Sequence, residues 1–238
     1  MSLCQITLSA NAGAAVRLGG VRIWVDALHT EPVSGFSSVS PELFSTVMEH
    51  PDFAEPNLIF YTHCHPDHFS QELTQQALER WPFAEAVLPE RRFSSQILLS
   101  RPRQQLSLAG LSARFVRLPH EGEQYADVAH YGCLLEYDGF RVLIPGDCAV
   151  ASPVLREFLE EVGPVDLALV DFPWITLSKG RRFLQQFIRP KHLAVFHLPF
   201  EKDDIYGYRR AVHKTVEQLP AGDLRVFLEP LQREVFDR

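Results

Sequence analysis

Short apolar runs separated by turn residues fill the first third of the chain, and they predict β-strands. Residues 3–26 contain two or three such runs, and the pair Gly19-Gly20 between two of them is typical of a hairpin turn. Residues 57–61 (Asn-Leu-Ile-Phe-Tyr) are apolar and aromatic, and therefore predict a buried strand. We expect this part of the protein to be rich in sheet.

A long proline-rich loop interrupts these strands at residues 27–56, with a short helix near residues 41–49. Its aromatic residues Phe36, Phe44 and Phe53 either line a substrate pocket or cover the core. We expect the loop histidines to be polar surface residues; they are His29 and His50.

Two helices are predicted between the loop and the middle of the chain. One begins after Ser70, a suitable N-cap, and the other spans residues 92–100 and ends at Arg101-Pro102. Strand-like runs follow at residues 105–108, 113–118, 132–137 and 139–144. The last two are joined by Asp138-Gly139, which predicts a tight hairpin.

Helices and strands alternate in the second half. Ser152-Pro153 is a favourable helix start, and helices are expected at residues 152–162, 177–188 and 203–219. Strands are expected at residues 166–172, 191–198, 224–228 and 234–236. The whole pattern predicts an α+β fold in which two sheets form a sandwich flanked by helices.

Composition narrows the class of protein. The chain has 238 residues, 46% hydrophobic and 22% charged, which is ordinary for a globular protein and sufficient for one large core. We expect a single domain over residues 1–238. The formal net charge of −7 argues against a general nucleic-acid or anionic-membrane surface. The partner that we expect is a small-molecule substrate. The sequence does not predict the oligomeric state.

The cysteines indicate the compartment. Cys4, Cys64, Cys133 and Cys148 show no paired spacing, and three lie in or beside apolar runs, where a thiol behaves as a small hydrophobic group. Residues 1–4 lack the basic and apolar regions of a signal peptide, and no apolar run approaches the length of a membrane span. We therefore expect reduced thiols and a cytoplasmic protein.

Residues 62–68 (Thr-His-Cys-His-Pro-Asp-His) carry the most specific chemical signal in the chain. They lie between a predicted strand and a predicted helix, on a loop at a strand end. His63 and His65 are alternate residues, so both rings can face one cation. The proline fixes a turn that presents Asp67 and His68 to a second, adjacent ion. The alternative is a histidine-rich polar loop without a metal.

This His-x-His-x-Asp-His run, with Phe60-Tyr61-Thr62 before it, resembles the signature of the metallo-β-lactamase-fold hydrolases. The short chain and the hairpin before Gly146-Asp147 are similar to the compact branch that includes the ascorbate-lactone hydrolases. The resemblance implies a four-layer αββα sandwich. It also implies a third histidine ligand, an Asp after Gly at a strand end, and a late histidine.

Two of these further ligands each match one position. Asp147 follows Gly146 at the end of a predicted strand, and by resemblance it bridges two ions, which a carboxylate with two oxygens can do. His197 closes an apolar strand before Pro199, as the final ligand of the family does. The alternatives are a turn residue for Asp147 and a buried structural histidine for His197.

The third histidine is open between two positions. His120 stands at a predicted strand end and is favoured, whereas His130 precedes the strand from residue 132, where some branches of the family place a histidine. Asp26 also ends a predicted strand. It either caps the following turn or, by resemblance, supports a metal ligand from behind.

The resemblance implies a hydrolase with two divalent cations, most suitably zinc, with iron or manganese as alternatives. The first ion would have ligands His63, His65 and His120, and the second would have Asp67, His68 and His197, with Asp147 between them. The ions would activate a shared water against an ester, lactone or phosphodiester, and the leaving group would take a proton from Asp67 or a metal-bound water. The competing hypotheses are an iron-dependent oxidoreductase similar to the sulfur dioxygenases and a non-catalytic metal-binding member.

Overall fold

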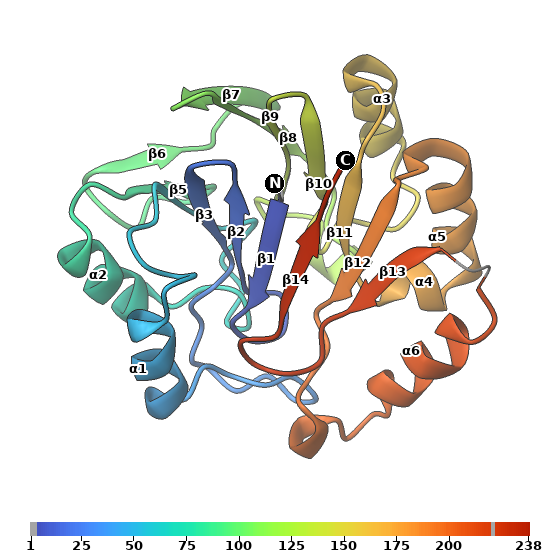
Figure 1. Ribbon diagram of the computed structural model, residues 1–238, viewed down its shortest axis with the longest axis horizontal. Helices are drawn as coiled ribbons and strands as arrows, with labels where there is room; N and C mark the ends of the chain where they lie inside the picture. The colour runs from blue at the N-terminus through green and yellow to red at the C-terminus, as the bar shows by residue number, and fades with distance from the viewer. Residues whose placement is uncertain (1–3, 220–221) are drawn as a thin grey trace.

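Two seven-stranded sheets form the centre of the computed structural model, which describes residues 4–219 and 222–238 (Figure 1). In spatial order the first sheet consists of β14 (Arg233–Phe236), β1 (Cys4–Leu8), β2 (Ala14–Leu18), β3 (Val21–Val25), β4 (Leu58–Phe60), β5 (Glu85–Leu88) and β6 (Gln96–Leu98). The second consists of β13 (Asp223–Val226), β12 (His192–Phe196), β11 (Leu167–Asp171), β10 (Phe140–Ile144), β9 (Tyr131–Tyr137), β8 (Leu111–Arg117) and β7 (Arg103–Leu108).

Helices cover the outer face of each sheet (Figure 1). Over the first sheet lie α1 (Pro41–Glu49) and α2 (Gln71–Arg80). Over the second lie α3 (Pro153–Val162), α4 (Pro173–Thr176), α5 (Ser178–Phe183), the π-helical turn η2 (Leu184–Ile188) and α6 (Tyr208–Val216). Two 3₁₀ turns, η1 (Glu123–Tyr125) and η3 (Glu201–Asp203), lie in loops. The fold is therefore the predicted α+β sandwich with αββα layering.

Alternating side chains of the strands build three apolar layers. Ile23 and Val25 of β3 point into the layer between the sheets and belong to the same apolar cluster as Val142 and Leu169 of the second sheet, whereas Trp24 belongs to the cluster beneath the helices. Since both faces of the central strands are covered, strands such as β4 and β11 consist almost entirely of apolar residues. Each fully buried aliphatic side chain contributes about 1.5–3 kcal/mol to folding. The single-domain organisation of residues 1–238 stays a prediction.

Local sequence signals account for several boundaries. Ser152 caps α3 by accepting a hydrogen bond from the Leu155 amide at 3.4 Å, and Ser70 caps α2 in the same way. The predicted hairpin is confirmed between β9 and β10, where Asp138 and Gly139 both adopt positive φ, as a type I′ turn requires.

Two predicted helices are wrong in whole or in part. Residues 92–100 form a loop and the strand β6, because the Gln96 side chain accepts hydrogen bonds from the amides of Arg92 and Phe93 and β6 extends the first sheet. The helix expected from residue 203 begins only at Tyr208. The carboxylate of Asp204 caps it by accepting hydrogen bonds from the amides of Tyr208 and residue 209.

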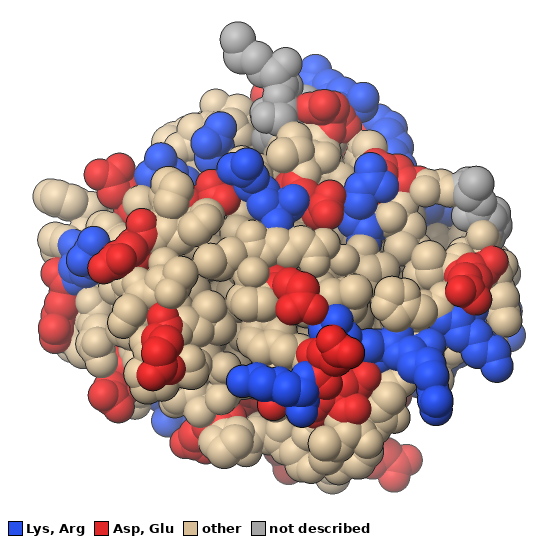
Figure 2. Space-filling view, turned by 60° about the horizontal axis from the view of Figure 1, so that its bottom comes forward, with Lys and Arg blue, Asp and Glu red and all other residues tan. Residues whose placement is uncertain are grey.

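The direction of the strands determines where the functional loops gather. Strands β3 to β6 run parallel in the first sheet, and β10 to β13 run parallel in the second. Their carboxyl ends meet at one edge of the sandwich, which is the lower edge in Figure 1 and faces forward in Figure 2. In the described part of the chain, no helix has the length and apolar character that crossing a bilayer requires.

Candidate metal centre

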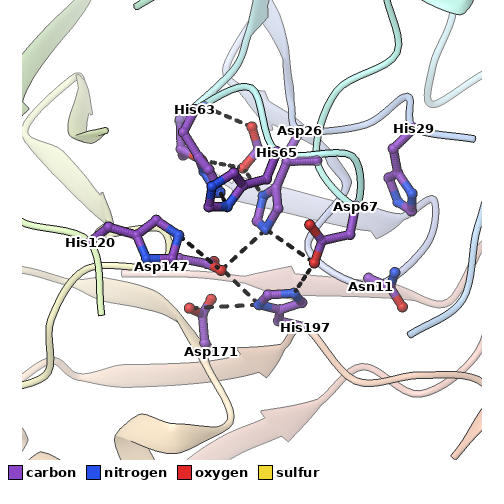
Figure 3. A network of polar contacts seen from close by, with 12 residues as sticks. Asn11, Asp26, His29, His63, His65, Asp67, His120, Asp147, Asp171 and His197 are labelled. Atoms are coloured by element: carbon purple, nitrogen blue, oxygen red, sulfur yellow. Dashed lines mark hydrogen bonds and ion pairs between the residues drawn. The ribbon is translucent and has the colours of Figure 1, made fainter. Parts of the chain in front are cut away.

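All seven residues predicted as metal ligands lie together at this edge. The loop after β4 supplies four of them, and the loops after β8, β10 and β12 supply one each (Figure 3). They are His63, His65, Asp67, His68, His120, Asp147 and His197. The two sheets therefore contribute to one cluster of side chains from segments that are far apart in the sequence.

Three imidazoles form the first potential cation position. Donor atoms of His63, His65 and His120 lie within 4.8 Å of one another. The Nδ1 atom of His120 lies 2.8 Å from the carbonyl oxygen of Glu121, which directs its Nε2 atom into the cluster. A backbone bridge between His120 and Cys148 fixes this loop against the loop after β10.

The second potential position is formed by Asp67, His68 and His197, whose donor atoms also lie within 4.8 Å of one another. The Nε2 atom of His197 is 3.7 Å from Oδ2 of Asp67, and that of His68 is 4.0 Å from the same oxygen. The backbone of His197 has φ of 57°, a left-handed conformation that costs a non-glycine residue about 1–3 kcal/mol. The fold maintains this strained conformation at a residue of the cluster.

Asp147 lies between the two positions (Figure 3). Its Oδ2 atom is 3.3 Å from Nε2 of His68 and 3.9 Å from Nε2 of His120, and its Oδ1 atom is 3.3 Å from Nδ1 of His197. The preceding Gly146 has φ of 60°, and a Cβ there would lie 2.7 Å from Nε2 of His130. Glycine is needed at this position so that Asp147 can turn into the cluster.

Asp26 supports the cluster from behind. It accepts hydrogen bonds from the amide and hydroxyl of Thr62, at 2.7 and 2.6 Å, and from Nδ1 of His68 at 3.0 Å. The carboxylate therefore orients both the ligand loop and one imidazole, which agrees with the supporting role rather than with a simple turn cap.

Two further histidines are buried beside the cluster. His130 lies behind it, with Nδ1 3.3 Å from the carbonyl oxygen of Leu118, and its ring takes no part in either group of donors. Of the two histidines, only His120 belongs to such a group among the described residues, and its role as the third metal ligand stays a prediction. His29 is also completely buried, with Nε2 3.3 Å from the carbonyl oxygen of Ala10, so its prediction as a surface residue is wrong.

Asp171 is a residue of the cluster that the sequence reasoning missed. It is the last residue of β11, only 5% exposed, and its Oδ2 atom is 3.7 Å from Nδ1 of His197. The available signal was an acidic residue at the end of an apolar strand; only strand pairing shows that this strand lies beside β12.

Aromatic rings flank both positions. Phe36 stacks on His197 with ring centroids 4.7 Å apart, and the partly exposed ring of Tyr125 lies 4.9 Å from His65. By contrast, Phe53 is buried against Trp24 in the outer layer of the first sheet. The loop 27–56 therefore contributes Phe36 to the surroundings of the cluster and Phe53 to the core.

Polar contacts hold this loop over the cluster. The amide of Ser37 donates to the Asn11 side chain at 3.0 Å, and the Ser37 hydroxyl donates to Asp203 at 2.6 Å. The backbone of Asn11 in turn accepts a hydrogen bond from the His197 amide at 2.9 Å. Segments from both halves of the chain are thereby tied together beside the second position.

Electrostatics separate His68 and His197 of the second position from His63 of the first, because their pKa values are shifted in opposite directions. Burial alone would lower the pKa of His68 and of His197, but the Asp147 carboxylate raises both pKa values well above the usual range. Burial also opposes ionisation of Asp147, and the charges of His197 and His68 outweigh it and lower the Asp147 pKa. At His63 burial prevails, with the charge of His68 acting in the same direction, and lowers its pKa.

The pKa values of Asp67 and Asp171 are shifted in opposite directions, although both carboxyl groups are near His197. Burial disfavours the charged form of Asp67, but its hydrogen bond to His197 and the charge of His68 lower its pKa below the usual range. Burial and the adjacent Asp147 carboxylate raise the pKa of Asp171 to about 7.

The donor set fits divalent metal ions. The Nε2 atoms of His68, His120 and His197 and the Oδ1 atom of Asp147 are buried without a hydrogen-bond partner among the described residues. Buried polar atoms are almost always satisfied, so several such donor atoms that converge on one space suit a bound metal ion. Imidazole and carboxylate are the ligands of zinc, iron and manganese.

Comparison with known proteins defines the fold. No protein-family model matches this sequence, and no curated protein matches it either. Solved structures do match. The metallo-β-lactamase-fold protein YhfI from Bacillus subtilis has a TM-score of 0.68 and 12% identity, with 99% of this chain and 100% of that chain covered.

Two further matched structures belong to enzymes with a stated activity. Isothiocyanate hydrolase from Delia radicum gut bacteria has a TM-score of 0.68 and 15% identity, with 98% of both chains covered. CmlA, a diiron β-hydroxylase from Streptomyces venezuelae, has a TM-score of 0.61 and 16% identity, with 99% of this chain but 54% of that chain covered. Other matched structures are described as metallo or metal-dependent hydrolases. The chain has the metallo-β-lactamase fold.

Proposed function

We propose that the protein is a hydrolase that binds two divalent cations and uses them to activate water. The observation that carries this proposal is the position of Asp147, which lies between a group of three imidazoles and a group of two imidazoles with a carboxylate. One carboxylate facing two donor groups is the arrangement expected of a bridging ligand.

The proposed ligands differ between the two positions. His63, His65 and His120 would hold the first ion through nitrogen, and a set of three imidazoles suits zinc. The second ion would be held by one carboxylate and two imidazoles, from Asp67, His68 and His197. This mixed set also suits iron or manganese.

In the proposed mechanism, the bound cations would lower the pKa of a shared water toward neutrality and polarise the scissile bond. The residues of the chain would hold and orient the reacting groups. The side chain of Asp67 is 13% exposed, so it reaches the space from which substrate enters. Its carboxylate would accept the proton that the attacking water loses and pass it to the leaving group. Phe36 and Tyr125 would hold the substrate between their rings.

We infer that the substrate is a small ester or lactone. The aromatic rings of Phe36 and Tyr125 beside the cluster suit an uncharged organic substrate. Lys179 forms an ion pair with Glu121, so its charge is already compensated and is less suited to binding a phosphate. On the face shown in Figure 2, basic and acidic side chains are interspersed, which does not favour a nucleic-acid track. Phosphodiesters remain the alternative substrates.

The test is metal analysis followed by a substrate screen. The purified protein, reconstituted with zinc, manganese or ferrous iron, should contain about two ions per chain. Esters, lactones, phosphodiesters, thioesters and isothiocyanates are then offered under each metal, with the Asp147→Asn protein as the matched control. Absence of bound metal after reconstitution would refute the proposal.

An iron-dependent oxidoreductase is the second candidate, supported by the match to the diiron β-hydroxylase. It predicts that iron is the metal retained on purification and that oxygen is consumed with turnover. Hydrolysis with zinc and without oxygen consumption would exclude it.

We also propose that the protein is cytoplasmic. In support, the four cysteines are free thiols and three of them are buried. Measuring the accessible thiols in cells against a reduced and denatured control would test this compartment.

A further inference from the structure

Each imidazole of the second position has a carboxylate behind its Nδ1 atom. Asp26 lies 3.0 Å from Nδ1 of His68. Asp171 lies 3.7 Å from Nδ1 of His197, and Figure 3 shows these two side chains next to each other. Asp26 follows the end of β3 in the first sheet, and Asp171 ends β11 in the second. The two sheets thus supply one supporting carboxylate each.

The register of the second sheet places Asp171 beside His197. Asp171 pairs with Phe196 across the parallel strands β11 and β12, one residue before His197. Its side chain is buried, and its Oδ1 atom has no hydrogen-bond partner among the described residues. A buried carboxylate needs a cationic or hydrogen-bonding neighbour, and among the described residues Asp171 forms an ion pair with the His197 ring.

Two carboxylates, those of Asp171 and Asp147, compete for the proton on Nδ1 of His197. Oδ1 of Asp147 lies 3.3 Å from the same nitrogen. If Asp147 accepted the Nδ1 proton, its oxygen would be occupied by His197 and less able to face a cation. If Asp171 accepts it, both oxygens of Asp147 are free to bridge.

We propose that Asp171 is a positioning residue that accepts the Nδ1 proton of His197, fixes the tautomer in which Nε2 faces Asp67, and leaves Asp147 free to bridge. A neutral imidazole binds a cation through the nitrogen without the proton, so the acceptor at Nδ1 determines which nitrogen is available. This inference rests on the proposed binding of two cations.

The conformation of His197 supports this assignment. Its backbone amide is held by Asn11, and its ring is stacked on Phe36. These contacts fix the plane of the ring, but neither selects one ring nitrogen for the proton. Asp171 and Asp147 are the only carboxylates facing Nδ1 within 4.0 Å among the described residues.

The experiment compares cobalt binding by the whole protein and by D171N and D171A variants, using competition with a chromophoric chelator. The control is D52N, because Asp52 is a nearly buried carboxylate that accepts a hydrogen bond from Thr7 and lies outside the cluster. We expect the first ion to bind normally in every variant. The second ion should bind about 10–100-fold more weakly in D171A, with D171N intermediate and D52N unchanged.

Several outcomes would overturn the inference. Unchanged affinity for the second ion in both Asp171 variants would show that the carboxylate does not act through His197. A changed absorption spectrum of fully loaded cobalt D171N would make Asp171 a ligand instead. If D171A does not fold, D171N alone decides. A wild-type protein that binds no second ion would refute the proposed function itself, and this inference with it.

Discussion

The Nδ1 atom of His68 donates to Oδ2 of Asp26 across 3.0 Å, and both side chains are almost completely buried. Asp26 also receives the amide and hydroxyl of Thr62. One carboxylate therefore joins the end of β3 to the loop that carries most of the proposed ligands. Asp26 adopts φ of 47°, so the backbone is strained at the residue that makes these contacts.

Substituting Asp26 should affect both folding and metal binding. Asp26→Ala leaves the Thr62 amide and the His68 Nδ1 atom without an acceptor, so the free energy of unfolding should fall by about 2–5 kcal/mol. Asp26→Asn should retain more stability but weaken the second ion about 10–100-fold. Urea unfolding and metal titration measure the two effects. Metal affinity equal to wild type in both variants would contradict the role of Asp26.

Substitution of His120 should reduce metal binding, whereas substitution of His130 should reduce stability. His120→Ala removes a proposed ligand whose Nε2 atom points into the first position, so bound metal should fall by about one ion per chain. His130→Ala creates a cavity behind the centre and should cost about 1–3 kcal/mol of unfolding free energy while metal is retained. Elemental analysis and thermal unfolding distinguish them. Loss of metal in the His130 variant alone would reverse the assignment.

Asp147→Asn should impair activity more than it impairs folding. An amide keeps the shape but loses the charge that bridges two cations. Without metal the variant should have nearly the melting temperature of the wild type. With metal the wild type should be stabilised by ligand linkage, by about 2.7 kcal/mol at a hundredfold excess over Kd, and the variant much less. Equal stabilisation with retained turnover would show that Asp147 is only a turn residue.

The metal-free protein should lose stability in acid because of two buried histidines. Burial lowers the pKa of His130 to about 3, and burial together with the charge of His68 lowers that of His29 to about 4. Between these values and about 6.5 the unfolded chain binds protons that the folded chain excludes. The contribution to stability is complete above about pH 6.5 and falls by about 1.4 kcal/mol per pH unit for each histidine.

The measurement is the free energy of unfolding of the metal-free protein between pH 4.5 and 6.5. His130→Gln should reduce the slope by about one proton even if it lowers stability throughout, because glutamine does not titrate. An unchanged slope would contradict the neutral state of His130.

Metal binding should release protons at neutral pH. The Asp147 carboxylate keeps the pKa values of His68 and His197 raised, so without metal these imidazoles carry protons that cations must displace. Apparent affinity should therefore increase with pH. Calorimetry in buffers of different ionisation enthalpy should detect release of about one to two protons per chain. A binding enthalpy independent of buffer would contradict this prediction.

The sequence by itself determined the class of fold and much of the candidate centre. The apolar runs specified buried strands because each sheet is covered on both faces, so every position along β11 needed an apolar side chain until Asp171. The ligand loop was recognisable because His63, His65, Asp67 and His68 are close in the sequence and local geometry brings them together. Asp147 and His197 were predicted because they stand at strand ends where the family resemblance implies a carboxylate after Gly and a late histidine.

Only the tertiary structure decided which distant side chains meet. His120 and His130 both lie beside apolar segments of the sequence. Only in the folded protein does a backbone bridge to Cys148 hold His120 next to the loop after β10. The local signal of Asp171, an acidic residue at the end of an apolar strand, did not reveal its neighbour, because its relation to His197 depends on the pairing of β11 with β12. The sequence predicted His29 at the surface, but it is buried in the loop that Asn11 and Ser37 hold in place. Such contacts arise from strand pairing and loop packing, which no short stretch of sequence encodes.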